Sequence, residues 1–438
     1  MTQTHFQTLI HARWLITIEQ DGEVLHHHTL AIQNDNIAAI APTADVTHWT
    51  ADEVITLDEH ALMPGFVNLH GHSAMTLLRG YADDLALMDW LQNHIWPAEG
   101  KHVSHDFVRD GSMIGMAEMI RSGTTTINDM YFYHSAVAEA GQKAAMRTFV
   151  GASILEFPTN YAQNADEYIS RAVAERESYL NDPLITFTLA PHAPYTVSDD
   201  TFRKVVATSE KHNMLVHCHI HETADEVNNS VKEHGKRPLA RLNNLGVLND
   251  KLIGAHMVHL NDEEIALVAR LNIAIAHNPS SNMKLASGIA PIQKLLDAGV
   301  TVGIGTDGAA SNNKLDMFAE TRSAALLAKV GTLNPIAVPA ATALRMATLE
   351  GAKALHIADQ IGSLKVGKRA DLIAIDMGSL ETAPIFDVIS HIVYTAGREH
   401  VSHSWINGRC VMRERTLATL DETALKATAS EWRERIQK

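Results

Sequence analysis

The chain has 438 residues, of which 46% are hydrophobic and 20% are charged, as in a globular protein with a large core. That length allows two or three ordinary domains, or one large α/β barrel with an appendage. The 36 basic and 51 acidic side chains leave a formal charge of -15, which argues against a nucleic-acid-binding surface.

The sequence pattern also argues against a membrane protein and against a secreted protein. No stretch approaches the roughly 18 uninterrupted apolar residues of a membrane helix, so we expect no membrane partner. Residues 1–20 lack the basic-then-apolar order of a secretory signal, and the only two cysteines, Cys218 and Cys410, indicate no disulfide framework. We therefore expect a cytoplasmic protein.

The first sixty residues predict short strands separated by polar turns. Alternating apolar residues and the turns at 21–22 and 34–36 indicate a small β layer. The expected strands are 15–18, 29–33, 37–40 and 53–57.

From residue 62 the pattern changes to apolar strands that alternate with helical segments. Eight strand-plus-helix units in a row predict a closed parallel barrel. An open doubly wound sheet is the alternative, but no Gly-x-Gly-x-x-Gly follows an early strand. The expected strands are 62–69, 124–130, 148–155, 185–190, 214–219, 252–256, 273–277 and 301–305, with helices such as 107–121, 201–212, 262–271 and 291–298 between them.

After the barrel, residues 334–355 predict two helices broken at Pro339. Strand patterns return at 362–375 and 401–411, and 421–438 predicts an amphipathic terminal helix. We therefore predict an α/β fold, a (β/α)8 TIM barrel over 61–358. A small discontinuous β-sandwich domain is expected from both ends of the chain, over 1–60 and 359–438.

The apolar run that opens the barrel ends in His70 and His72. Residues i and i+2 of a strand point to the same side, so both imidazoles can reach one metal ion. A His-x-His alone is a weak signal, but later strand ends carry His192, His219, His256, His277 and Asp307. The carboxyl ends of barrel strands meet at one mouth, so these side chains are expected to converge.

The fifth strand ends in Cys218-His219-Ile220-His221-Glu222. His219 is best placed as a ligand, and Glu222, three residues later in the loop, is a candidate proton carrier. We expect His217 to be a core residue below the site and His221 to be exposed in the loop.

Together His70, His72, His219 and Asp307 supply three imidazoles and one carboxylate for one divalent ion. Such a set suits zinc, with iron or another borderline metal as alternatives. The fourth strand end, Ala190-Pro191-His192-Ala193, offers no lysine to bridge a second ion, so one ion per subunit is expected.

The motifs resemble those of the amidohydrolase superfamily, and within it the 5'-methylthioadenosine/S-adenosylhomocysteine deaminases. The resemblance spans nearly the whole chain in order. It is carried by the segments 64–72, 191–195, 219–223, 255–260, 277–285 and 305–313.

The resemblance implies hydrolytic deamination of an adenine ring at C6, with the metal lowering the pKa of its water. It implies a metal held by His70, His72, His219 and Asp307. Glu222 is expected to protonate N1, while Asp307 and His256 orient the water and accept its proton. Glu222 and Asp307 thereby also contact the substrate. The resemblance further implies nucleoside binding by Trp90, Glu99 and His192, with Glu99 on the ribose hydroxyls and His192 on the purine.

Some relatives place arginines after the third barrel strand to hold the homocysteine carboxylate, whereas 151–160 contains none. A neutral tail therefore suits this chain better, which favours 5'-methylthioadenosine over S-adenosylhomocysteine. Guanine, oxoguanine or triazine deamination, or triazine dechlorination, is the alternative on the same site. A metal-free assembly protein is the alternative from another class, although no ligand is missing. The sequence gives no interface signal and leaves homo-oligomerisation open.

Overall fold

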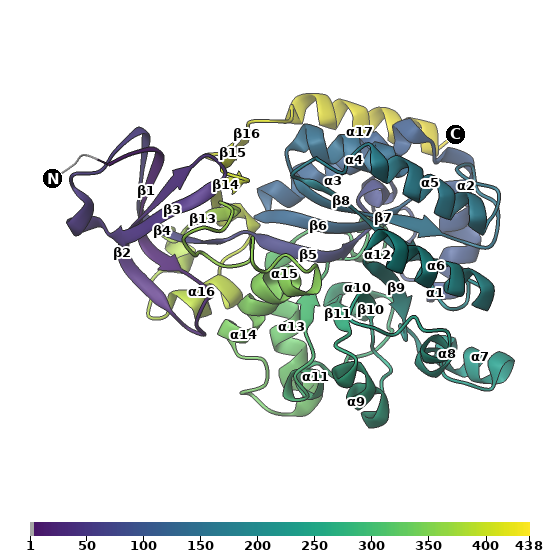
Figure 1. The fold of residues 1–438 in the computed structure, drawn as a ribbon. Coiled ribbons are helices and arrows are strands. Elements are labelled where there is room, and N and C mark those ends of the chain that lie inside the picture. Colours follow the sequence, from purple (N-terminus) through teal and green to yellow (C-terminus); the bar gives the residue numbers. More distant parts are fainter. Residues whose placement is uncertain (1–3) are drawn as a thin grey trace.

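Eight parallel strands form a barrel in the computed structural model, which describes residues 4–438 (Figure 1). The strands follow one another around the barrel in chain order, and helices cover its outside. The prediction of a (β/α)8 barrel is confirmed. The strands are β5 (Phe66–Gly71), β6 (Thr124–Tyr131), β7 (Arg147–Ile154), β8 (Ile185–Pro191), β9 (Val216–Ile220), β10 (Leu252–His256), β11 (Ala274–His277) and β12 (Val302–Ile304).

The ring closes where the first and last strands meet. The backbone N–H of Asp307 donates to the carbonyl of His70 at 3.0 Å, just beyond the end of β12. Gly305 permits this approach, because a Cβ there would lie 2.8 Å from the backbone nitrogen of His70. The closure thus brings two predicted ligands side by side.

Capping side chains explain where many barrel helices begin. Ser104, Asn164, Ser198, Thr223 and Asn261 each accept a hydrogen bond from the backbone N–H three residues later, which satisfies an amide that the helix leaves unpaired. The helices from α3 to α13 are α3 (His105–Arg121), α4 (His134–Ala144), α5 (Ala165–Glu177), α6 (Asp199–His212), α7 (Ala224–His234), α8 (Pro238–Asn244), α9 (Asp262–Arg270), α10 (Pro279–Lys284), α11 (Ile292–Asp297), α12 (Ala309–Asn312) and α13 (Met317–Thr332).

Strands from both ends of the chain form the second part of the fold. They pair as one continuous sheet in the order β16-β15-β14-β13-β4-β1-β2-β3, with β4 joining the N-terminal strands to β13. The sheet encloses a core that includes Ile10, Leu30, Leu62, Leu372 and Trp405. The predicted β domain therefore takes the form of one sheet around a shared core. Its strands are β1 (His5–Ile16), β2 (Val24–Gln33), β3 (Asn36–Pro42), β4 (Thr50–Pro64), β13 (Leu372–Asp376), β14 (Val401–Ile406), β15 (Arg409–Arg413) and β16 (Thr416–Leu417).

The junction between the sheet and the barrel differs from the expected first barrel strand. β4 continues to Pro64, and Gly65 donates its N–H to the carbonyl of Asp371 before β5 begins at Phe66. A side chain at 65 would collide with Thr125, whose Cγ2 would lie 2.1 Å from the added Cβ. One continuous segment therefore provides β4 of the sheet and β5 of the barrel, and the chain changes direction between them at Gly65.

The helical region after the barrel also differs from the prediction. Residues 334–339, expected to be helical, are not, because Pro339 occupies the N-cap position of α14 (Ala340–Arg345). A proline lacks the N–H that a helix interior needs, so it marks the start of the helix. The helix continues through η4 (Met346–Glu350) to α15 (Gly351–Ala354).

The C-terminal helix α17 (Glu422–Ile436) packs over the barrel beside α3 (Figure 1). Trp432 contacts Phe107 edge to face, with ring centroids 5.3 Å apart, and donates its indole N–H to Asp110. Within residues 4–438 no helix has the length and apolar character needed to cross a membrane.

A buried ion pair joins the barrel to the sheet. Arg147 of β7 donates through Nε to Asp371 Oδ2 at 2.7 Å and through Nη2 to Oδ1 at 3.1 Å. Asp371 is 3% exposed and also accepts the backbone N–H of Asn407. The carboxylate thus accepts three hydrogen bonds from two separate segments of the chain.

We expect Asp371→Ala to lower the free energy of unfolding by about 3 kcal/mol, because it leaves the Arg147 guanidinium buried without its counter-ion. Urea denaturation measures the change. The exposed pair Lys294–Asp262 provides the control, since Lys294→Ala should cost less than about 1 kcal/mol. Equal losses in both variants would contradict the prediction.

Candidate active site

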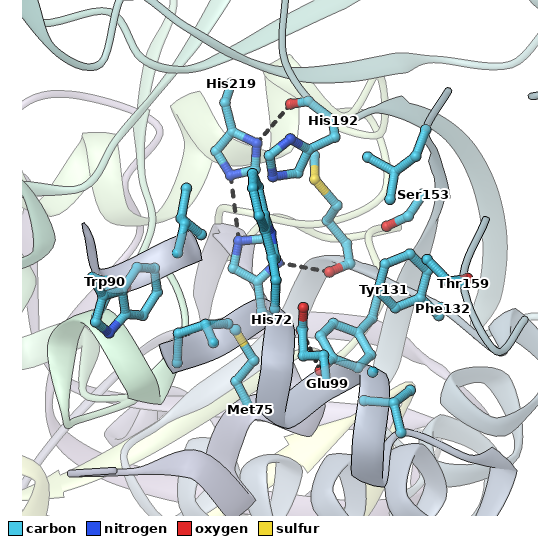
Figure 2. A pocket seen from close by; sticks show the side chains of 18 of the residues that line it. His72, Met75, Trp90, Glu99, Tyr131, Phe132, Ser153, Thr159, His192 and His219 are labelled. Carbon is cyan, nitrogen blue, oxygen red and sulfur yellow. Dashed lines mark hydrogen bonds between the residues drawn. The ribbon is translucent and has the colours of Figure 1, made fainter. Parts of the chain in front are cut away.

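The predicted ligands gather at the carboxyl end of the barrel, and Figure 2 shows two of them, His72 and His219, facing each other. His70 Nε2 lies 3.2 Å from Asp307 Oδ1, and His72 Nε2 lies 3.1 Å from the same oxygen. His219 Nε2 lies 3.3 Å from His72 Nε2. Four side chains from β5, β9 and the end of β12 thus point one atom each at a common centre.

His256 also faces this centre. One ligand atom each from His70, His219, His256 and Asp307 lies within 4.8 Å of all the others. This group shares three members with the predicted set and contains His256 in place of His72. His256 Nε2 is also 3.9 Å from a Glu222 oxygen, so it stands between the centre and that carboxyl group.

Contacts on the far side of the rings fix the direction of the ligand nitrogens. His72 Nδ1 lies 2.7 Å from the carbonyl of Met130, and His219 Nδ1 lies 2.7 Å from the carbonyl of His192 (Figure 2). A carbonyl only accepts, so each Nδ1 carries a proton, and each Nε2 is the ring atom left to bind a metal ion. His70 Nε2 is buried without a hydrogen-bond partner. Imidazole nitrogens and a carboxylate converging in this way fit a divalent metal ion.

Asp307 is held as an anion. Its Oδ2 accepts from the hydroxyls of Ser281 at 2.6 Å and Ser311 at 2.8 Å, and its Oδ1 accepts the N–H of Gly308 at 2.8 Å. Burial alone would raise its pKa, but the contacts with His70 and His72 hold the pKa well below its usual range. The charge therefore stays on this carboxylate when the site is buried.

Glu222 lies in the loop above β9 and is 4% exposed. Burial raises its pKa, while His256 opposes the shift and Asp307 adds to it. A carboxyl group whose pKa is raised holds its proton to a higher pH than an exposed glutamate does, which suits it to proton transfer.

A cavity of about 190 Å³ opens beside the centre. Trp90 of η3 (Trp90–Ile95), Glu99 of α2 (Trp96–His102) and His192, which the resemblance assigns to nucleoside binding, all line it, and so do Glu222 and Asp307. Figure 2 shows Trp90 and Glu99 around the cavity from segments that follow the first barrel strand.

Tyr131, which the sequence analysis did not single out, contacts Glu99. Its hydroxyl at the end of β6 donates to Glu99 Oε1 at 2.7 Å. Burial raises the pKa of Glu99 to about 7, although this hydrogen bond acts to lower it. Tyr131 stands at a barrel strand end, so the rule that selected the histidines would have found it if applied to every strand end.

One expectation about histidines was wrong, and one was confirmed. His221 is fully buried, not exposed: its Nδ1 lies 3.1 Å from the carbonyl of His259, and Leu239 donates its N–H to the other ring nitrogen. The loop after β9 turns inward beneath α8. His277 is buried at its strand end but does not line the cavity. His217 is a buried core residue, as expected.

The amidohydrolase family pattern matches residues 61–411, which covers the whole barrel and the cluster just described. The chain belongs to this family. The resemblance inferred from the motifs is thereby confirmed.

Individual amidohydrolases resemble the chain over nearly its full length. A 5-methylthioadenosine/S-adenosylhomocysteine deaminase of Teredinibacter turnerae is 44% identical over 97% of this chain and 96% of its own. A 5'-deoxyadenosine deaminase of Methanobrevibacter smithii is 41% identical over 90% of each chain. A crystal structure of an adenosine deaminase from Xanthomonas campestris with bound zinc covers 99% of both chains, with 47% identity and a TM-score of 0.98.

His217 supports His70 from behind the ligand cluster. Its Nε2 lies 2.9 Å from His70 Nδ1, and Asn128 Nδ2 lies 3.1 Å from its other ring nitrogen. His70, His217 and Asn128 are all fully buried, so solvent does not reach this series of polar contacts.

We expect His217→Phe to weaken the binding of a divalent metal ion, with zinc as the probe, about 10–100-fold, because the new ring cannot orient His70. Competition with a chelator measures the apparent zinc dissociation constant. His403→Phe is the matched control, since His403 is a buried histidine of the distant β sheet and stacks on Trp405. Zinc binding that is equally strong in both variants would contradict the prediction.

Proposed function

We propose that this amidohydrolase deaminates the adenine ring of 5'-substituted adenosines, with 5'-methylthioadenosine as the preferred substrate. The observation that carries the proposal is one cavity that joins a His/Asp metal-binding cluster to two buried carboxyl groups, Glu222 near the centre and Glu99 farther out. The three relatives described above, each named as a deaminase of an adenosine or adenosine derivative, support the same chemistry.

The proposed ion is one zinc per subunit, held by His70, His72, His219 and Asp307. His72 is preferred to His256 as a ligand because its Nε2 lies 3.1 Å from Asp307 Oδ1, whereas His256 Nε2 also faces the Glu222 carboxyl group at 3.9 Å. Bound there, zinc lowers the pKa of a water molecule toward neutrality, which provides a nucleophile at working pH.

The protein's own groups then move the protons. Glu222 delivers a proton to N1 of the purine, so that negative charge does not accumulate on the ring while water adds to C6. Asp307 and His256 orient the attacking water and accept its proton. The proton taken from the water then passes to the C6 amino group, Glu222 regains its proton from the new C6 hydroxyl, and the C6–N bond breaks to release ammonia and leave the inosine analogue.

Other cavity residues position the nucleoside. In the proposal Trp90 packs against the substrate and His192 contacts the purine. Glu99 accepts from the ribose hydroxyls, and the hydrogen bond from Tyr131 to one of its oxygens leaves the other oxygen for the substrate.

The outer wall of the cavity favours a neutral 5' group. Its aromatic pair, Trp96 and Phe157, has ring centroids 5.9 Å apart. Thr159 is hydrogen-bonded to Tyr168, and Asn160 donates to the carbonyl of Gly100, so these polar groups are already satisfied. The described residues that line the cavity include no lysine or arginine, which leaves no cation for a homocysteine carboxylate.

Two observations weigh against the other functions considered. A guanine or triazine substrate has no ribose and would leave the Glu99 carboxyl group buried without a partner from the ligand. An assembly protein needs no complete set of inward-facing ligand atoms, whereas the cluster here is complete.

Ammonia release from a substrate panel tests the proposal. We expect kcat/KM for 5'-methylthioadenosine to exceed that for S-adenosylhomocysteine by about tenfold or more, since an unpaired carboxylate at the outer wall costs at least about 1.4 kcal/mol. Free adenine, guanine and ammeline should show little turnover. Faster turnover of a free base than of any adenosine would refute the nucleoside assignment.

We expect Glu222→Gln to lower kcat by about 10²–10⁴-fold while zinc content stays at the wild-type level, because the amide cannot donate an acidic proton to N1. Steady-state kinetics and metal analysis on the same sample measure both quantities. A variant that turns over at nearly the wild-type rate would show that Glu222 does not carry the proton.

A further inference from the structure

Glu226 lies directly behind Glu222 in the first turn of α7. Its side chain is buried, with 9% of the residue exposed. One carboxylate oxygen accepts the backbone N–H of Glu222 at 2.7 Å, and the other accepts the N–H of His221 at 3.0 Å. No lysine or arginine in residues 4–438 forms an ion pair with it, so the two consecutive amides are its main partners.

The His221–Glu222 turn, which donates both of its N–H groups to Glu226, has an unfavourable backbone conformation. His221 has a φ of +56°, in the left-handed region that residues other than glycine rarely adopt. Other contacts hold the same residue from the opposite side, because its carbonyl accepts the N–H groups of Val258 and His259. The chain therefore leaves β9 through a strained residue that the surrounding structure must hold in place.

This turn decides where Glu222 points. Glu222 directly follows the left-handed residue, and one of its oxygens lies 3.9 Å from His256 Nε2 at the metal-binding cluster. If the turn relaxed to an ordinary conformation, the Glu222 side chain would leave this position. Misplacement of a reacting group by about 1 Å can cost 10²-fold in rate.

We infer that Glu226 is a positioning residue whose carboxylate fixes the His221–Glu222 turn and so aims the Glu222 carboxyl group at the reacting purine. The inference rests on the proposed role of Glu222 as the proton carrier. Glu226 does not itself line the cavity and is not one of the clustered ligand residues, so it acts through the backbone N–H groups that it binds.

Two N–H donors are best matched by a carboxylate. Burial raises the pKa of Glu226 to about 7, and the two N–H groups act to lower it, which favours the ionised form. Each oxygen of Glu226 accepts one N–H, and both donors are satisfied at once. A glutamine of the same length has one acceptor and an NH₂ group, which would oppose one of the N–H groups. The contact with Thr223 is different, because there the hydroxyl accepts the backbone N–H of Glu226 as an ordinary helix cap.

Glu226→Gln therefore tests the inference in the intact chain loaded with zinc. We expect kcat on 5'-methylthioadenosine to fall about 10²-fold, with KM within about threefold of wild type and zinc content unchanged. Asp225→Asn is the matched control, since it removes the same charge from an exposed neighbouring position in the same helical turn and should keep the wild-type kcat.

Amide hydrogen exchange of the 219–226 segment gives a second readout that does not depend on turnover. The amides of His221 and Glu222 should exchange at least about tenfold faster in Glu226→Gln than in wild type, and at the wild-type rate in Asp225→Asn. Glu226→Asp provides a further variant if the glutamine form folds poorly, because it keeps the charge but withdraws the carboxylate by one methylene. We expect it to show the same two effects.

Wild-type kcat and wild-type exchange in Glu226→Gln would overturn the inference. A fall in kcat that only follows a loss of zinc or of folded protein would also overturn it, since that result indicates a general structural role. Failure of the proposed function has a different result, in which the wild-type chain releases no ammonia from any adenosine. In that case the exchange rates still test whether the Glu226 carboxylate holds the His221–Glu222 turn.

Discussion

The convergence of imidazole nitrogens on the Asp307 carboxylate is the constraint on which the rest of the site depends. Gathering the rings of His70, His219 and His256 beside Asp307 in a water-poor interior is unfavourable unless a cation joins them. Carbonyls and His217 fix the outer nitrogens, and two serine hydroxyls and an amide fix Asp307. The protein thus arranges the ligand geometry in advance.

The barrel and most of this cluster could be predicted from the sequence because both follow from simple periodicity. Apolar strands alternating with helices predict the barrel, and the parallel strand ends must meet at one mouth, so His219, His256 and Asp307 could be expected together. The same rule cannot show how a loop turns after its strand. His221 was therefore expected to be exposed, although the left-handed backbone at this residue turns its ring into the core.

The nucleoside-binding side of the cavity could not be predicted from periodicity. Trp90 and Glu99 lie on short helical segments after β5, where no repeating pattern indicates which side chains face the cavity. Their placement was expected only from the resemblance to a family. The prediction of a helix before Pro339 was wrong for a local reason. Apolar residues before a proline do not show on which side of it the helix lies, and here the helix begins after Pro339.

The closure between Asp307 and His70 also has a consequence for how the protein is made. The first histidines leave the ribosome long before the last strand, so a growing chain holds two ligands of an unfinished set for most of its synthesis. A complete coordination sphere exists only after the eighth strand docks beside the first, which makes metal loading a late event that reports on finished folding.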